Sequence, residues 1–132
     1  MQTISDMLIQ IKNAQAAGRD RLVVPFSKMR WEVARVLQEA GFVQELDKKK
    51  KKARKAEHNW IELKLDTNNG RLPITGVRIL SKPSRRWYVK SSELRPVVSG
   101  FGIAILSTPR GIMTGKEARK QNLGGELIAE VW

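Results

Sequence analysis

The chain has 132 residues, a formal net charge of +12 and no cysteine. This length accommodates one domain or two small ones. The absence of cysteine excludes disulfide scaffolds, cysteine-bound metal sites and thiol catalysis. Hydrophobic residues make up 41% of the chain, which is enough for a packed core. A charge this positive favours a polyanionic partner, with nucleic acid ahead of an acidic membrane.

The N-terminal third predicts a helix, a strand and a second helix. Apolar residues recur at helical spacing over residues 4–14, and residues 21–26 (RLVVPF) are typical of a short strand. Ser27 is placed to cap a second helix, and Gly41 follows the last residue of its apolar stripe.

Residues 48–55 (KKKKKARK) hold seven of the 25 basic residues, and removing those seven charges would leave a net charge of +5. The run lies between two expected strands, at residues 42–46 and 60–66. Because a block of like charge repels itself, we expect a long, mobile, solvated loop. The one histidine, His58, lies beside the run and is interpreted as a surface-loop residue rather than a general base.

The pattern as a whole predicts an α+β protein with two small subdomains. Asn68-Asn69-Gly70 is typical of a turn, and we place the boundary there, giving an N-terminal domain at 1–67 and a C-terminal domain at 68–132. The first reads helix, strand, helix, strand, strand. The second is richer in strand: strands are expected at residues 76–81, 86–90, 102–107 and 126–132, with short helices at 91–99 and 114–121.

Few features of the sequence support an enzymatic function. The acidic residues are scattered and lie mostly beside Lys or Arg, which favours solvated surface pairs over a carboxylate dyad. Residues 111–117 resemble a phosphate-binding loop, but three residues separate the glycines instead of four, and Glu117 stands where a hydroxyl would bind Mg²⁺. The longest uncharged stretch, residues 96–109, is too short to cross a membrane. We therefore expect no catalysis, cofactor, metal, small-molecule substrate or membrane partner.

The segment Ser107-Thr108-Pro109-Arg110-Gly111 ends an apolar strand abruptly. Its hydroxyls and backbone N–H groups suit hydrogen bonds to base edges, sugar or phosphate, and its arginine suits phosphate contact or stacking. The alternative is a plain connection in which Thr108 and Thr114 serve only turn and cap roles, and composition alone favours it.

A cation–aromatic cluster at residues 82–90 allows bases to stack on rings while cations follow the phosphates. Strand alternation predicts that either Trp87 or Tyr88 faces the core, leaving at most one ring free.

The C-terminal segment (GIAILSTPRGIMTGKEARKQNLGGELIAEVW) resembles the signature of the bacterial-type small-subunit ribosomal protein eight family. Four features match in order: Ser-Thr-x after an apolar strand, Gly-x-Met-Thr, Glu-Ala-Arg heading a helix, and Gly-Gly-Glu before a last strand. The opening ISDMLIQIKNAQAAG, the residues Pro25, Ser27 and Lys28, and Tyr88 with the following ELRP are also similar to the family.

This resemblance implies a two-domain α+β protein that binds the central domain of 16S ribosomal RNA and helps to assemble the platform of the small subunit. It implies neighbouring small-subunit proteins as partners and a cytoplasmic, ribosome-bound location, with an organellar ribosome as the alternative. A second function left open is translational repression, through a messenger RNA that mimics the ribosomal site.

The resemblance also supplies most of a predicted RNA-binding set, in which Gly-Gly-Glu supports the Ser-Thr turn and the polar N-terminal positions form a second surface. Pro109 stands where the family often carries serine, and proline offers neither a hydroxyl nor an N–H group. The lysine run is not a family hallmark, so phosphate affinity, contact with a neighbouring protein and a solvated loop all stay open for it. The full set is Ser107, Thr108, Pro109, Arg110, Gly111, Tyr88, Arg86, Gly124, Gly125, Glu126, Thr3, Asp6, Lys12, Asn13, Ser27, Lys28 and Arg30.

Overall fold

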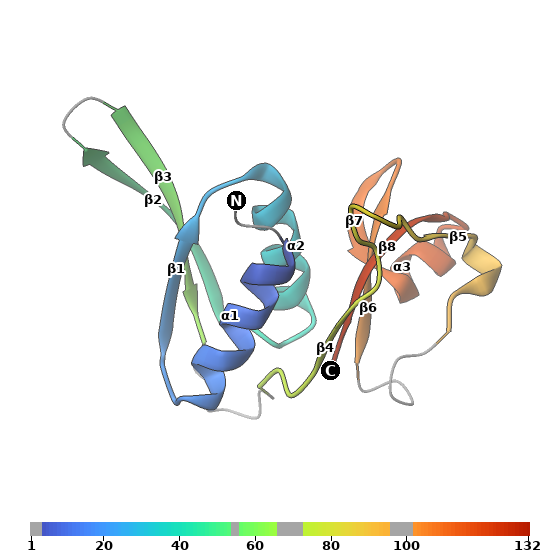
Figure 1. Ribbon diagram of the computed structural model, residues 1–132, viewed down its shortest axis with the longest axis horizontal. Coiled ribbons are helices and arrows are strands. Elements are labelled where there is room, and N and C mark those ends of the chain that lie inside the picture. The colour runs from blue at the N-terminus through green and yellow to red at the C-terminus, as the bar shows by residue number, and fades with distance from the viewer. Residues whose placement is uncertain (1–3, 54–55, 66–72, 96–101) are drawn as a thin grey trace. The chain divides into compact units, whose positions relative to one another are not determined.

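The structure is a computed structural model that describes residues 4–53, 56–65, 73–95 and 102–132. Helices and antiparallel sheets confirm the α+β class (Figure 1). The chain divides into two compact units, Met1–Ile74 and Thr75–Trp132, and each is described by itself. The boundary predicted at residues 67 and 68 lies outside the described residues and stays a prediction.

In the first unit, two helices cover one face of an antiparallel sheet with strand order β1-β3-β2. Its core lies between the helices and the sheet, and includes Leu8 and Ile11 from α1, Leu37 from α2 and Ile61 and Leu63 from β3. The elements are α1 (Ile4–Ala16), β1 (Arg21–Pro25), α2 (Lys28–Glu39), β2 (Glu45–Ala53) and β3 (Ala56–Lys64).

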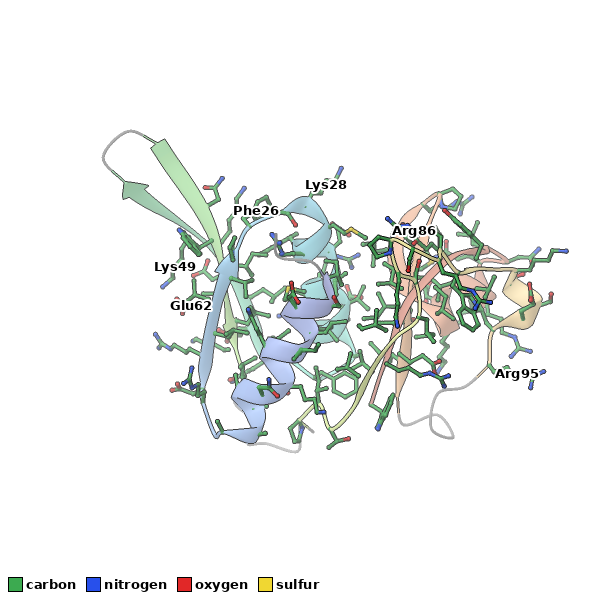
Figure 2. The ribbon with its side chains drawn as sticks, viewed as in Figure 1. Phe26, Lys28, Lys49, Glu62, Arg86 and Arg95 are labelled. Carbon is green, nitrogen blue, oxygen red and sulfur yellow. The ribbon has the colours of Figure 1, made fainter. Side chains whose placement is uncertain are left out.

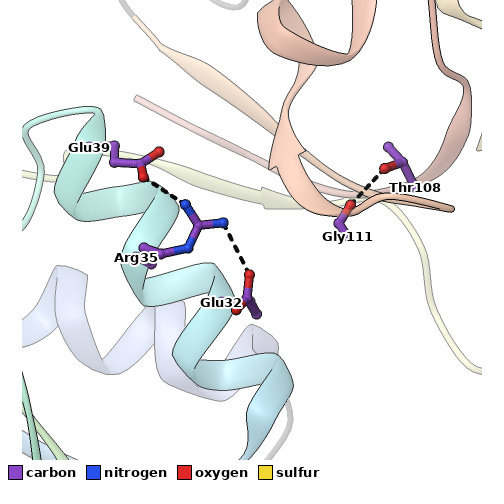
Figure 3. A network of polar contacts seen from close by, with 5 residues as sticks. All are labelled: Glu32, Arg35, Glu39, Thr108 and Gly111. Atoms are coloured by element: carbon purple, nitrogen blue, oxygen red, sulfur yellow. Dashed lines mark hydrogen bonds and ion pairs between the residues drawn. The ribbon is translucent and has the colours of Figure 1, made fainter. Parts of the chain in front are cut away.

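Helix α2 has the ends that the sequence predicted. The Ser27 hydroxyl accepts a hydrogen bond from the Arg30 N–H at 3.0 Å, which caps the first turn. Gly41 follows the C-cap with a φ of +91°, a left-handed conformation that glycine adopts without steric cost. On its solvent side, Arg35 donates to Glu32 at 3.0 Å and to Glu39 at 2.6 Å (Figure 3), as expected for residues three and four apart on a helix.

The loop predicted at residues 48–55 is wrong for residues 48–53, which belong to strand β2, and residues 54 and 55 lie outside the described residues. The residues that β3 places opposite Lys48 to Lys52 are Ile61, Trp60, Asn59, His58 and Glu57, and none of them is Lys or Arg. Like charges directly opposite one another would destabilise the ladder, and this register avoids them. His58 accordingly belongs to β3 rather than to a loop, and both strands extend further along the run than the sequence indicated.

The second unit is built around the last strand. β8 pairs with β4, β5 and β6, and β6 also pairs with β7, all antiparallel. Helix α3 packs on one face through a buried cluster of Leu94, Ala104, Leu106 and Ala118. The elements are β4 (Val77–Ile79), β5 (Tyr88–Val89), η1 (Ser91–Glu93), β6 (Ile103–Thr108), β7 (Gly111–Thr114), α3 (Gly115–Lys120) and β8 (Gly125–Val131).

Two helix predictions for this unit have different outcomes. The Thr114 hydroxyl caps α3 by accepting from the Glu117 N–H at 3.2 Å, as predicted. The helix predicted at residues 91–99 is a single 3-10 turn, η1, and residues 96–101 lie outside the described residues.

A bulge interrupts the pairing of β6 with β8. Ile105 lies opposite Ala129, but the next residue, Leu106, lies opposite Leu127, so Ile128 has no partner on β6. The Ile128 carbonyl instead accepts from the N–H groups of Leu80 at 3.1 Å and Ser81 at 3.3 Å. The extra residue of β8 therefore binds the segment that follows β4.

Candidate nucleic-acid interface

Three segments that lie far apart in the sequence meet across strands β5, β8 and β6. Glu126 of β8 lies opposite Tyr88 on one side and opposite Ser107 on the other. Directly opposed residues of antiparallel strands project from the same face of a sheet. Tyr88, Glu126 and Ser107 therefore form one cross-strand row, at the end of β6 where the turn Thr108–Gly111 begins.

Two glycines allow β8 to approach both of its neighbours at this row. A Cβ atom on Gly125 would lie 2.2 Å from the Ser107 carbonyl oxygen, and one on Gly124 would lie 2.6 Å from the Val89 carbonyl oxygen. Both distances are far below a van der Waals contact, and the obstructing atoms are backbone. Any larger residue would therefore push the turn or β5 away from β8.

The turn itself requires the residues that the sequence places there. Gly111 has a φ of +112°, whereas neither Pro109 nor Arg110 has a positive φ. This is the pattern of a type I turn followed by a left-handed glycine, and proline favours the second position of such a turn because its φ is already fixed. The missing N–H of Pro109 leaves no gap, because a type I turn does not use the N–H of its second residue. The N–H of the next residue, Arg110, donates to the Thr108 hydroxyl at 3.2 Å.

The two hydroxyls of the turn are not equivalent. The Thr108 hydroxyl donates to the Gly111 carbonyl at 2.7 Å (Figure 3) and accepts from Arg110, so one lone pair is left for a ligand. Thr108 and Thr114 do have the turn and cap roles of the plain alternative. The Ser107 hydroxyl, in contrast, makes no hydrogen bond within the described part of the chain, and it retains both donor and acceptor capacity.

Glu126 organises the segment that leads into β5. Its carboxylate accepts from the Ser81 hydroxyl and from the Arg86 guanidinium at 3.3 Å, and the Ser81 hydroxyl accepts from the Trp87 N–H at 3.3 Å. Ser81 was absent from the predicted set. Its role arises from a contact across 45 residues, which no local pattern signals.

Both aromatic rings of this segment are exposed, so the prediction of at most one free ring is wrong. Tyr88 is 70% exposed and Trp87 is 42% exposed. The prediction assumed a strand over residues 86–90, but β5 contains only Tyr88 and Val89. Strand alternation therefore does not extend to Trp87, and Val89 supplies the contact with the buried cluster.

The remaining predicted residues lie in the first unit, at α1 and at the start of α2. Asp6 and Asn13 are exposed on α1, where Lys12 is half-buried, and Lys28 is exposed. Ser27 and Arg30 are half-buried; Ser27 caps α2, and Arg30 donates to the Pro25 carbonyl at 3.5 Å. Thr3 lies outside the described residues.

The base of the β2–β3 hairpin holds two consecutive lysines, Lys48 and Lys49, which strand alternation places on opposite faces. The Lys48 ammonium lies 4.3 Å from the centre of the Phe26 ring, and the Lys49 ammonium lies 2.8 Å from the Glu62 carboxylate (Figure 2). Arg21 lies 3.7 Å from the same carboxylate. The hydrogen bond from Lys49 and these positive charges hold the pKa of Glu62 below its ordinary value.

Sites of other kinds are not found in the described ranges. No three His, Asp or Glu side chains there gather as metal ligands would. None of the helices described combines the length and the apolar composition of a membrane span.

The comparisons with known proteins agree over almost the whole chain. The family model described as ribosomal protein S8 matches residues 2–132. Proteins named small ribosomal subunit protein uS8 are similar: 45% identity over 133 residues in Geobacillus kaustophilus, 44% over 130 in Trichormus variabilis and 40% over 129 in Streptomyces griseus. Each alignment covers 98% of this chain and 96% of the relative. The chain therefore belongs to the ribosomal protein S8 family, whose members are structural components of the ribosome and not enzymes.

Proposed function

We propose that this chain binds the central domain of 16S ribosomal RNA directly and helps to assemble the platform of the small subunit. The coarser role follows from its family: it is a structural ribosomal protein that associates with ribosomal RNA and other ribosomal proteins. The direct contact and its location on the RNA are the proposal.

The observation that supports this proposal best is the cross-strand row of Tyr88, Glu126 and Ser107 beside the turn Thr108–Gly111. It places a free hydroxyl, an acceptor and the exposed Tyr88 ring on a framework fixed by strand pairing, and the exposed Trp87 ring directly precedes Tyr88 in the chain. Irregular RNA offers unpaired bases that stack on rings and expose edges for hydrogen bonding, whereas regular A-form helices do not. A rigid, sparsely charged surface of this kind is suited to discriminate between RNA shapes.

Cations near the row supply affinity without discrimination. Arg86 is held by Glu126 and still exposes about half of its side chain, 55%, while Arg110 lies at the exposed tip of the turn. Contacts of this kind to phosphates position a protein on RNA and weaken as salt increases. The predicted residues of α1 and α2 form a second group that we assign to the same RNA.

The test is a titration of the full chain with a 16S central-domain fragment and with a regular RNA duplex of equal length, at about 0.15 M salt. We expect the fragment to bind at least about 1,000-fold more tightly, the lower end of the range typical of specific nucleic-acid recognition. Equal affinity for the two RNAs would refute specific recognition.

A matched pair of serine variants locates the site. Ser107→Ala removes the free hydroxyl of the row, and Ser92→Ala removes an exposed hydroxyl of η1 outside it. Only Ser107→Ala should reduce the preference for the fragment. Sedimentation with small subunits at high salt tests assembly: stoichiometric retention supports it, and loss of the chain into the soluble fraction favours a separate regulatory role.

A further inference from the structure

The far end of the β2–β3 hairpin is a ribbon of two strands with no third strand beside it in the described part of the chain. β1 pairs with β3 from Arg21–Lys64 to Pro25–Trp60. Beyond that point, residues 50–53 of β2 pair with residues 56–59 of β3, and the Phe26 N–H donates to the Asn59 carbonyl at 3.0 Å. Figure 1 shows this ribbon extending past the end of β1 and past both helices of the first unit. We call these two segments the ribbon.

The ribbon and its base are rich in positively charged residues. Residues 48–59 contain seven Lys or Arg and one acid, Glu57. At its base, Lys49 has an acidic partner in Glu62, and Lys48 lies over the Phe26 ring. The other acids of the two strands, Glu45 and Asp47, lie on the side of the base away from the ribbon. No second acid follows along it.

Such a ribbon is unfavourable by itself. Two-stranded hairpins are at best marginally stable in water, and consecutive like charges repel one another. Lysine on an edge strand does prevent edge-to-edge aggregation, but one or two charges are enough for that purpose. Five consecutive lysines exceed this need, which indicates a partner that compensates the charge.

We propose that the ribbon binds the phosphate backbone of RNA, as a contact separate from the Ser107–Thr108 turn and indifferent to sequence. Successive residues of a strand alternate between its two faces, so lysines on the same face of the ribbon follow one another every ~6.6 Å. A nucleic-acid strand carries an uninterrupted series of phosphates, one per ~3.4 Å of duplex axis. The regular repeat of charge in both favours RNA over an acidic protein surface. This inference rests on the proposed function, because it takes ribosomal RNA as the working partner of the chain.

The test compares salt dependence rather than affinity at one salt concentration. The ribbon variant carries Lys50→Gln, Lys51→Gln and Lys52→Gln. The matched control removes three charges at the opposite end of the same sheet, with Arg21→Gln and Lys64→Gln in the sheet and Arg19→Gln in the connection that precedes β1. Each protein is titrated with the 16S fragment and with the regular duplex between 50 and 200 mM KCl.

We expect the ribbon variant to lower the slope of log affinity against log salt by about 2–3 on both RNAs, as loss of three phosphate contacts requires. The ratio of the two affinities should stay as in the unaltered chain, and the control should change the slope by less than about 1. A variant with arginine at the same three positions should restore the slope. Restoration of the slope by arginine would show that the effect comes from lost charge and not from unfolding. Circular dichroism of each variant checks its folding independently.

Three results would overturn the inference: an unchanged slope in the ribbon variant, an equal change in the control, or an altered preference for the fragment. A ribbon variant that binds both RNAs normally but loses binding to poly-glutamate would indicate an acidic protein partner instead. A different result would refute the proposed function without refuting the ribbon contact. If the unaltered chain binds fragment and duplex equally but the ribbon variant still flattens the slope, specific recognition is refuted and the ribbon contact stands.

Discussion

The hairpins β6–β7 and β2–β3 share an antiparallel backbone but differ in what they present to a partner. In β6–β7, two residues form the turn, β8 approaches within the space that Gly125 leaves, and the Thr108 hydroxyl makes hydrogen bonds within the turn. In β2–β3, the ladder continues past the end of β1, and lysines occupy five consecutive positions. The first hairpin fixes the position of a few polar atoms, while the second presents charge.

This difference indicates a division of labour in RNA binding. Hydrogen bonds and stacking depend on position to within a fraction of an ångström, so they belong on a surface that strand pairing and glycines hold in place. Interaction with phosphates depends mainly on charge density, so a less supported ribbon suffices. The predictions below separate positional effects from charge effects, beginning with the largest.

Gly125→Ala should destabilise the chain by about 3 kcal/mol, because its Cβ would lie 2.2 Å from the Ser107 carbonyl oxygen and backbone would have to move. Gly18→Ala is the control: it meets no atom within 4 Å and carries only the strain of a φ of +73°, a cost of about 1–2 kcal/mol. Urea unfolding measures both. Equal losses in the two variants would show that close approach at Gly125 is unimportant.

Ser107→Ala should weaken binding to the 16S fragment by about 1–3 kcal/mol, the scale of a lost or unsatisfied polar contact. Its stability should change by less than about 0.5 kcal/mol, since the hydroxyl has no partner within the described part of the chain. Fluorescence titration and urea unfolding give the two quantities. A loss of stability as large as the loss of affinity would contradict the assignment of a free hydroxyl.

Thr108→Ala should weaken RNA binding by a similar 1–3 kcal/mol and should also reduce stability by about 1 kcal/mol, because the hydroxyl makes two hydrogen bonds within the turn. Thr108→Ser, which keeps the hydroxyl, should retain most of both. If Thr108→Ala lost affinity and Thr108→Ser lost as much, the methyl group rather than the hydroxyl would be responsible.

Glu126→Gln should lower the unfolding free energy by about 1 kcal/mol, because an amide accepts from Ser81 and Arg86 without the charge that strengthens both bonds. The backbone amide signals of Ser81 and Trp87 should shift in nitrogen–proton NMR spectra. Arg86→Gln, which removes one of the two donors, should produce the smaller change. Unchanged spectra in Glu126→Gln would show that the carboxylate does not position this segment.

Glu62→Gln should change stability least among these substitutions, and its effect depends on pH. Because Lys49 and Arg21 hold the pKa of Glu62 below its ordinary value of about 4.5, folding favours its charged form. That stability is present above the pKa of the unfolded chain and is lost as the pH falls through the lower, folded value. Urea unfolding at pH 6 and pH 3 should show a larger decrease for the unaltered chain than for Glu62→Gln. Parallel decreases would contradict the shift.

The correct predictions concern parts of the fold that depend on a few adjacent residues. The caps at Ser27 and Thr114, the glycine at position 41 and the buried strand before Ser107 each follow from a few adjacent residues. The lysine run was misassigned because its strand is specified by the residues opposite it rather than by its own composition.

The candidate site was visible only in part for the same reason. The family resemblance supplied the turn and the Gly-Gly-Glu residues, but not the contact of Ser81 with Glu126. The exposure of both rings was missed because β5 contains only Tyr88 and Val89, so strand alternation does not extend to Trp87. Contacts across many residues and the lengths of edge strands are properties of the folded sheet.

The unpaired residue of β8 has one further consequence. Ala129 and Glu126 face partners on β6 that are only two positions apart, although they are themselves three positions apart. Ile128 therefore shifts the pairing register of β8 with β6 by one residue, between the pair Ile105–Ala129 and the pair Ser107–Glu126. If β8 kept Ile128 but paired regularly with β6, Thr108 instead of Ser107 would stand opposite Glu126, and the free hydroxyl would move to the other face. Deleting Ile128, in contrast, would make the pairing continuous with Ser107 still opposite Glu126, and would remove the carbonyl that binds the N–H groups of Leu80 and Ser81.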